Sequence, residues 1–167
     1  MSPTQINVQA PSDNAVGAVS VVVDNNGAIS APMQVQLQPY APAFFMDPGT
    51  TYAIASRLPD YVVVGTGVDA CTSRGHARAV GYGLRATTPA VPAGVAVSGA
   101  PATPFPTITV GGVPATVIGS VLAPSSAGVY QIAIQLPSNV PTGNVALRAS
   151  IGGAQTPSGT TIVVAAQ

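Results

Sequence analysis

The chain has 167 residues and few charges: five Arg and five Asp, with no Lys and no Glu, for a formal net charge of zero at pH 7. With 18 Gly and 17 Pro and no Trp, it lacks the residues that build long amphipathic helices, which excludes a helical bundle. Five scattered arginines form no basic surface, so no nucleic acid partner is expected. The apolar runs are far shorter than the ~20 residues of a bilayer span, which predicts a soluble chain with no membrane insertion.

The first predicted element belongs to an internal repeat that relates the two ends of the chain. QINVQAPS at Gln5–Ser12 matches QIAIQLPS at Gln131–Ser138 at five of eight positions, with an offset of 126 residues. Similarity at a fixed offset predicts two copies of one supersecondary unit. At this offset the aligned pairs are Gly17 and Gly143, Val19 and Val145, Val21 and Leu147, and Gly27 and Gly153, and a two-residue shift then places Val35 on Val163.

Each copy is predicted to contain three strands joined by turns. Apolar residues alternate with polar or small ones over Met33–Leu37, Ile132–Leu136 and Val145–Ile151, which is the period of a half-buried strand. Asn26-Gly27 in the first copy is the dipeptide that best accepts the positive φ angles of a tight hairpin, and Gly152-Gly153 offers the same freedom in the second. We therefore predict an all-β fold, an immunoglobulin-like antiparallel β-sandwich of two related modules.

More predicted strands precede the second copy than the first. Thr107–Val110 and Ala115–Ser120 stand before Gln131, on either side of a Gly111-Gly112 turn, whereas only four residues stand before Gln5. A sandwich that lacks its opening strands has an apolar edge that needs cover. We therefore expect the first module to be incomplete, with cover from the middle of the chain, from a neighbouring molecule or from residues upstream.

Between the two copies the chain is less regular and richer in proline. Thr51–Ala55, Tyr61–Val64 and Ala77–Leu84 are predicted strands, and Thr87–Pro106 is predicted to be an extended linker or a strand that laces the two halves together. The predicted organisation is a partial immunoglobulin-like module at residues 1–48, an irregular β and proline-rich segment at 49–105, and an immunoglobulin-like module at 106–167.

Several of these segments resemble known domains. SPTQINVQAP at Ser2–Pro11, APAFF at Ala41–Phe45, GYGLRATTPAVPAG at Gly81–Gly94 and PTITVGGVPATV at Pro106–Val117, followed by VYQIAIQLP at Val129–Pro137, resemble an uncharacterised C-terminal domain of large secreted acidobacterial proteins. ITVGGVPATV also resembles the opening of IPT/TIG domains, which are immunoglobulin-like. The resemblance implies an exported β-sandwich module at an extracellular or cell-surface location, and it brings no catalytic residues.

The chain departs from that pattern at two places. CTSRGHAR at Cys71–Arg78 stands where a Pro-Gly-Asp turn is common, and Arg85 replaces a usual glycine. The conformation of these two loops is therefore not implied by the resemblance.

A glycine motif in the middle segment has the spacing of a dinucleotide fingerprint. VVVGTGVDA at Val62–Ala70 fits G-x-G-x-x-A after an apolar strand. The fingerprint also needs a following helix and an acidic residue about twenty positions later. Gly75 interrupts the next stretch and Asp69 is the last acidic residue of the chain, so no cofactor is predicted.

A polar cluster follows, with Asp69, Cys71, Ser73 and His76 within eight residues. A thiolate, an imidazole and a carboxylate are possible metal ligands, but a structural zinc site needs four ligands in known spacings. A nucleophile with its base is normally assembled from distant segments. We interpret the cluster as a polar surface loop with one free thiol, and we assign no catalytic, cofactor-binding or metal-binding residues.

The five aspartates are dispersed, which indicates roles in turns and caps rather than a calcium site. The aromatic residues of the middle third are predicted to form a small core cluster, with a sugar-stacking platform as the alternative. These residues are Tyr40, Phe44, Phe45, Tyr52, Tyr61 and Tyr82.

The sequence predicts a non-catalytic, extracellular structural or adhesive module. The incomplete first module predicts self-association by strand complementation between subunits, and a head-to-tail contact of that kind produces a filament. The alternative is a carbohydrate-binding module that tethers a secreted protein to polysaccharide through exposed, coplanar tyrosines. An enzyme has the least support, because the chain has one His and no Glu and shows no convergent acid and base.

Overall fold

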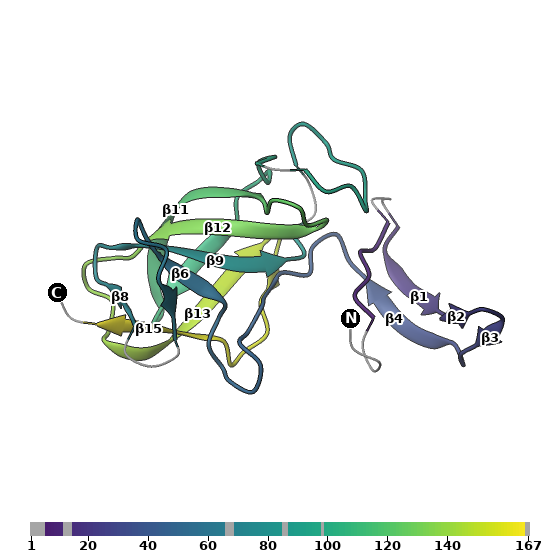
Figure 1. Ribbon diagram of the computed structural model, residues 1–167, viewed down its shortest axis with the longest axis horizontal. Helices are drawn as coiled ribbons and strands as arrows, with labels where there is room; N and C mark the ends of the chain where they lie inside the picture. Colours follow the sequence, from purple (N-terminus) through teal and green to yellow (C-terminus); the bar gives the residue numbers. More distant parts are fainter. Residues whose placement is uncertain (1–5, 12–14, 66–68, 85–86, 98, 166–167) are drawn as a thin grey trace.

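Figure 1 shows a computed structural model of the chain, which describes residues 6–11, 15–65, 69–84, 87–97 and 99–165. Every helix or strand assigned in these residues is a β-strand, which confirms the all-β prediction. The same residues contain no helix that could cross a membrane.

Most of the strands belong to one large sheet that folds over itself into two facing layers, so that β13 and β15 lie across from β9 and β12 (Figure 1). Among the described residues the named strands of this sheet pair antiparallel, except for the short parallel contact of β15 with β8, and Tyr52 adds a single parallel bridge to Thr161. In pairing order the strands are β7 (Val63–Val64), β6 (Ala55–Leu58), β9 (His76–Tyr82), β12 (Val129–Gln135), β11 (Val113–Leu122), β10 (Thr107–Val110), β13 (Gly143–Ile151), β15 (Thr161–Ala165) and β8 (Cys71–Thr72). Two further strands, β5 (Ala43–Phe44) and β14 (Ala154–Gln155), pair with β9 and β13.

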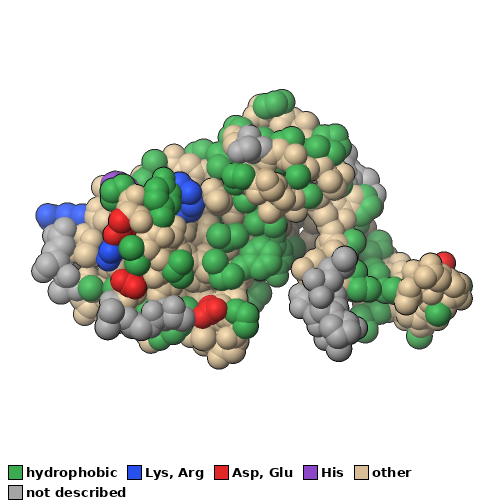
Figure 2. Space-filling model, in the orientation of Figure 1, with side chains coloured by type: hydrophobic (Ala, Val, Ile, Leu, Met, Phe, Trp, Pro, Cys, Tyr) green, Lys and Arg blue, Asp and Glu red, His purple; other side chains and the backbone are tan. Residues whose placement is uncertain are grey.

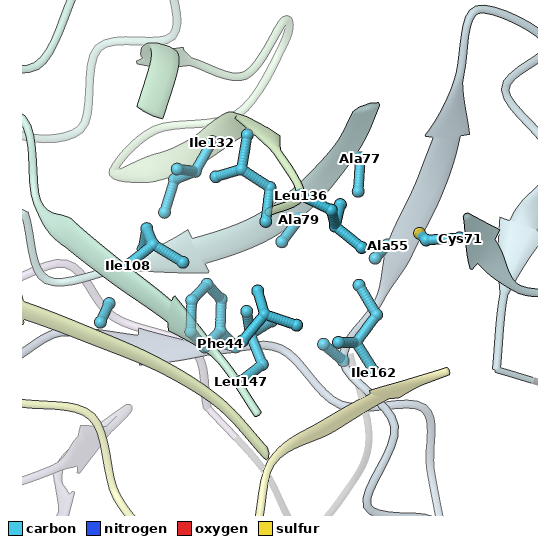
Figure 3. Packing of buried hydrophobic residues seen from close by; sticks show 14 of the residues in the cluster. Phe44, Ala55, Cys71, Ala77, Ala79, Ile108, Ile132, Leu136, Leu147 and Ile162 are labelled. Carbon is cyan, nitrogen blue, oxygen red and sulfur yellow. The ribbon is translucent and has the colours of Figure 1, made fainter. Parts of the chain in front are cut away.

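The hydrophobic core lies between the two layers of this sheet. Alternate residues of β12 and β13 are buried, as the period-two pattern predicts. Figure 3 shows Ile132 and Leu136 from one layer facing Leu147 and Ile162 from the other. These four side chains are nearly inaccessible to solvent. The folded sheet is therefore a sandwich with one contiguous core.

The middle of the chain contributes strands to the same sheet as the C-terminal third. β9, within the predicted strand Ala77–Leu84 except for its first residue, lies between β6 and β12 and pairs with both. The proline-rich stretch laces onto β11: the Ala102 amide donates to the Ser120 carbonyl at 2.8 Å, and the Leu122 amide donates to the Ala100 carbonyl at 2.8 Å. Residues 49–105 and 106–167 thus share one core in the described part of the chain.

The N-terminal segment forms a separate two-stranded structure. β1 (Gly17–Val21) pairs with β4 (Met33–Leu37), and between them β2 (Asp24–Asn25) pairs with β3 (Ala28–Ile29) around the Asn26-Gly27 turn. The φ angles of that turn are 52° and 88°, as the Asn-Gly dipeptide predicts. We call residues 17–37 the ribbon and the described residues from Pro39 onward the body. The ribbon extends away from the body in Figure 1.

Candidate interaction surface

The strand pairing of the ribbon matches that of β13 with β14 and β15 in the body. In both hairpins the strand begins at a glycine with a large positive φ angle, 105° at Gly17 and 98° at Gly143. The turn pairs also coincide at the offset of 126: Asp24 with Ile29 and Asn25 with Ala28 in the ribbon, Ser150 with Gln155 and Ile151 with Ala154 in the body. The internal repeat is therefore confirmed as a structural repeat over the ribbon. It is wrong for its best-matching segment, because residues 6–11 are exposed and form no strand, whereas the matching residues 131–135 belong to β12.

A side-chain hydrogen bond recurs in both copies at the same position. The Val23 amide donates to the Ser30 hydroxyl at 3.0 Å, and the Ser30 amide donates to the Val23 carbonyl at 2.9 Å. In the body the Ala149 amide donates to the Thr156 hydroxyl at 3.1 Å, and the Thr156 amide donates to the Ala149 carbonyl at 2.9 Å. The sequence analysis did not predict this equivalence. The signal for it is that Ser30 and Thr156, both hydroxyl residues, are separated by the repeat offset of 126.

One detail of the predicted repeat is wrong. Val35 pairs with Val19, and Ile162 pairs with Val145, so Val35 is equivalent to Ile162 and not to Val163. The loop after Thr156 holds one residue more than the loop after Ser30, and Gly159 in it has a φ angle of 106°. The offset between the two copies therefore increases by one residue after this loop, and not by the predicted two residues.

The two copies differ in what covers them. In the body, β10 pairs along β13, β8 pairs beside β15, and the opposite layer packs on their apolar side. Leu147 and Ile162 are each 1% exposed, whereas their equivalents Val21 and Val35 are 44% and 38% exposed. Among the described residues β4 is the only strand that pairs with β1. The ribbon is thus a hairpin of the same kind as the one in the core, but its apolar side is partly exposed to solvent.

The ribbon has one apolar and one polar face. Because residues that pair across an antiparallel ladder point to the same side, Ala18 and Ser20 lie with Gln36 and Gln34 on the polar face. We define the apolar face as Val19, Val21, Met33, Val35 and Leu37. Asp24 is the only charged residue of the ribbon, and its carboxylate accepts a hydrogen bond from the Gly27 amide at 2.7 Å. Figure 2 shows the other coloured charges over the body.

A second exposed surface lies on the outer side of β9. The rings of Phe45 and Tyr82 are 5.0 Å apart and inclined at 57°, and the Arg78 guanidinium lies 5.0 Å from the centre of the Tyr61 ring. Tyr61 and Tyr82 are 59% and 43% exposed. Tyr61 also has a φ angle of 58°, a conformation that side chains other than glycine rarely adopt.

The other two tyrosines of the predicted platform lie elsewhere. The Tyr52 hydroxyl is within hydrogen-bond distance, 3.0 Å, of the Asn144 side-chain amide. Tyr40 packs against the core, with its ring against Gly152. Phe44 is buried in the core, as expected for that aromatic residue. The predicted group of aromatic residues is therefore divided between the core and the outer face.

The predicted polar cluster does not converge on one point. Cys71 on β8 is completely buried, and that burial raises the pKa of its thiol to about 11, so the thiol is protonated at neutral pH. His76 is exposed at the start of β9. No group of three or more His, Cys, Asp or Glu side chains in the described residues is placed to hold a metal ion.

The glycine motif begins in β7. Val64 of β7 is buried and Gly65 follows it, residues 66–68 of the motif lie outside the described residues, and the next strand in the described part of the chain is β8. Arg57 supports this region, since it forms a salt bridge with Asp60 and donates from Nη1 to the Ala70 carbonyl at 3.2 Å. Hydrogen bonding to Arg57 lowers the pKa of the Asp60 carboxyl, and the same bond raises the pKa of Arg57. This pair therefore has a structural role.

Comparisons of the chain with protein-family models, curated proteins and solved structures find no match. The resemblance to the acidobacterial domain and to IPT/TIG domains therefore stays a prediction. The exposed apolar face of the ribbon is the candidate functional site.

Proposed function

We propose that the chain is a non-catalytic structural module of an exported protein, and that it self-associates through the ribbon. One observation carries the proposal: the same hairpin occurs twice, buried at its C-terminal copy and bare at its N-terminal copy. Leu147 and Val21 occupy equivalent positions at 1% and 44% exposure. An isolated hairpin is only marginally stable, and an exposed apolar face marks a site at which another polypeptide packs.

The energy available from covering the ribbon is moderate. On the apolar face Met33, Val21 and Val35 are 69%, 44% and 38% exposed, and Val19 and Leu37 are already partly buried. Full burial of the five side chains would contribute roughly 3 to 6 kcal/mol. Backbone hydrogen bonds along the open edge of β1 would add about 0.5 to 1.5 kcal/mol each. Part of this is offset by the loss of translational and rotational freedom. We therefore expect a dissociation constant in the micromolar to millimolar range.

The composition of the ribbon also favours association. Exposed strand edges are usually protected by Lys, by Pro or by inward-pointing charges. The strand Gly17–Val21 and the following Val22-Val23 contain none of these. If the covering segment is a different part of the neighbour, the contact does not close and a filament forms, and if like meets like the assembly is closed.

Sedimentation velocity over a wide range of concentration tests the proposal. We expect the average mass to rise with concentration, and Val21→Asp on the apolar face to weaken the association by at least about tenfold. Ser20→Asp, which adds the same charge to the polar face of the same strand, is the matched control and should have little effect. A chain that stays monomeric at all concentrations would overturn the proposal.

A second candidate function, binding of polysaccharide, is favoured by the outer side of β9. Tyr61 and Tyr82 are exposed there, with the ring of Phe45 beside Tyr82 and the Arg78 guanidinium beside Tyr61. Aromatic faces stack on the apolar faces of sugar rings. Arg78 and Tyr82 are four residues apart on β9, so their Cα atoms are about 13 Å apart along the strand, and the two tyrosines offer two separate stacking positions to a chain of sugars.

Retention on insoluble polysaccharides tests this second candidate. Tyr61→Ala and Tyr82→Ala should each reduce retention, whereas Val63→Ala, which removes an exposed aliphatic side chain from the neighbouring β7, should not. Equal retention of all three variants and the unmodified chain would exclude the tyrosines as the binding surface.

A further inference from the structure

We infer that the partner of the ribbon is the ribbon of a second copy of this chain, and that the two apolar faces pack against each other across a two-fold axis near Val35. The inference rests on the proposed function and adds to it the identity of the partner, the contacting face and a closed stoichiometry of two.

The body shows what kind of cover this hairpin takes. There the apolar sides of β13 and β15 face a second layer of strands, and Leu147 and Ile162 meet Ile132 and Leu136 across the core (Figure 3). Facing sheets of this kind pack about 10 Å apart. The surface that fits the bare ribbon is therefore another strand layer with an uncharged apolar face.

A second ribbon supplies such a layer. The apolar face consists of three valines, one leucine and one methionine and carries no charge, so two copies can meet without burying a charge or an unpaired side-chain polar group. Asp24 is the only charge of the ribbon, and it is already bonded to the turn at the tip. The face is thus self-complementary in its chemistry.

The position of the body decides how the two ribbons are oriented. The body joins the ribbon at the end opposite the Asn26-Gly27 turn (Figure 1). Ribbons that point the same way would bring two bodies together at one end, whereas antiparallel ribbons place the bodies at opposite ends and also keep the two Asp24 side chains apart. A two-fold axis that runs across the strands gives this antiparallel arrangement.

That axis puts the central residues of the ribbon opposite their own copies. Val19 and Val35 pair with each other at the middle of β1 and β4. In the inferred dimer, Val35 therefore faces Val35 of the second copy across the layer. The contact is isologous, so it closes at two molecules.

Cysteine cross-linking of the full chain tests this geometry. Cys71 is completely buried, so Val35→Cys introduces a single accessible thiol on the apolar face, and Gln36→Cys places one on the polar face of the same strand as the matched control. Facing layers lie about 10 Å apart, which is beyond the ~7 Å between Cα atoms that a direct disulfide tolerates, so a short bismaleimide cross-linker is used to join the two thiols. We expect the Val35→Cys chain to form a covalent dimer at least about tenfold faster than the Gln36→Cys chain.

Each other outcome overturns the inference in a recognisable way. If the unmodified chain associates but Val35→Cys cross-links no faster than Gln36→Cys, the faces are not in contact and the proposed self-association still stands. If sedimentation shows species that grow beyond two molecules, the two-fold contact is wrong and a filament takes its place. If the chain remains monomeric, both the inference and the proposed function fail.

Discussion

Gly83 is the residue at which the chain leaving the ribbon is attached to the body. The Ala41 amide donates to the Gly83 carbonyl at 3.1 Å, and a Cβ on Gly83 would overlap the Ala41 carbonyl oxygen. The φ angle of Gly83 is 77°, in the region that favours glycine. The sequence GYGLR contains two glycines, but the reason that position 83 favours glycine lies in a segment some forty residues away, and a local pattern does not contain it.

A matched pair of substitutions separates the close approach at Gly83 from its backbone conformation. Gly94 has a φ angle of 79°, but a Cβ added there would meet no atom within 4 Å. We expect Gly94→Ala to lower the free energy of unfolding by about 1 kcal/mol through the left-handed conformation alone. Gly83→Ala should lower it by roughly 2 kcal/mol more, because Ala41 must move. Urea unfolding measures both, and equal losses would show that the contact with Ala41 has no energetic weight.

Strands with a clear period were predictable at the level of elements. The alternation over Ile132–Leu136 and Val145–Ile151 predicts β12 and β13, and the dipeptide Asn26-Gly27 predicts the turn of the ribbon. These signals are local, because side-chain alternation and turn chemistry depend only on neighbouring residues. The repeat is a separate signal, read from identical residues at a fixed offset, and the equivalent hydrogen bonds of Ser30 and Thr156 confirm it for the ribbon.

Short strands and long-range pairings were not predictable in the same way. The two-residue strands β5 and β8 are too short to show a period, and β8 pairs with β15 from the far end of the chain. The predicted strand Thr51–Ala55 is displaced, since the regular element β6 begins only at Ala55, while the residues before it make single bridges to Thr161 and Met46. Which segments pair depends on the closure of the whole sheet, and the local pattern does not contain that information.

The same contrast applies to the candidate site. The apolar face of the ribbon follows from the alternation of apolar and polar residues over Met33–Leu37, which is a local pattern. No local pattern divides the tyrosines: Tyr61 and Tyr82 are exposed, whereas Tyr52 is within hydrogen-bond distance of Asn144. All three are tyrosines in or near strands of the body, and only the three-dimensional arrangement distinguishes them.

At the scale of the whole molecule, the chain combines a sandwich that is complete with a hairpin that is not. The body buries both layers of its sheet around one core. The ribbon repeats part of that sandwich outside the core, with its apolar face in solvent. In the proposed function the body presents the ribbon as an association element, and because the ribbon carries almost no charge we expect the proposed association to depend only weakly on salt.

Backbone hydrogen exchange at a series of protein concentrations tests the central claim most directly. Amides that are hydrogen-bonded in a covered sheet exchange slowly, and those of an isolated hairpin exchange quickly. We predict that the amides of β13 and β15 are protected at every concentration, whereas those of β1 and β4 exchange quickly in dilute solution and become protected as the concentration rises. Equal protection of the two hairpins in dilute solution would contradict the account, because it would mean that the ribbon is already covered within one molecule.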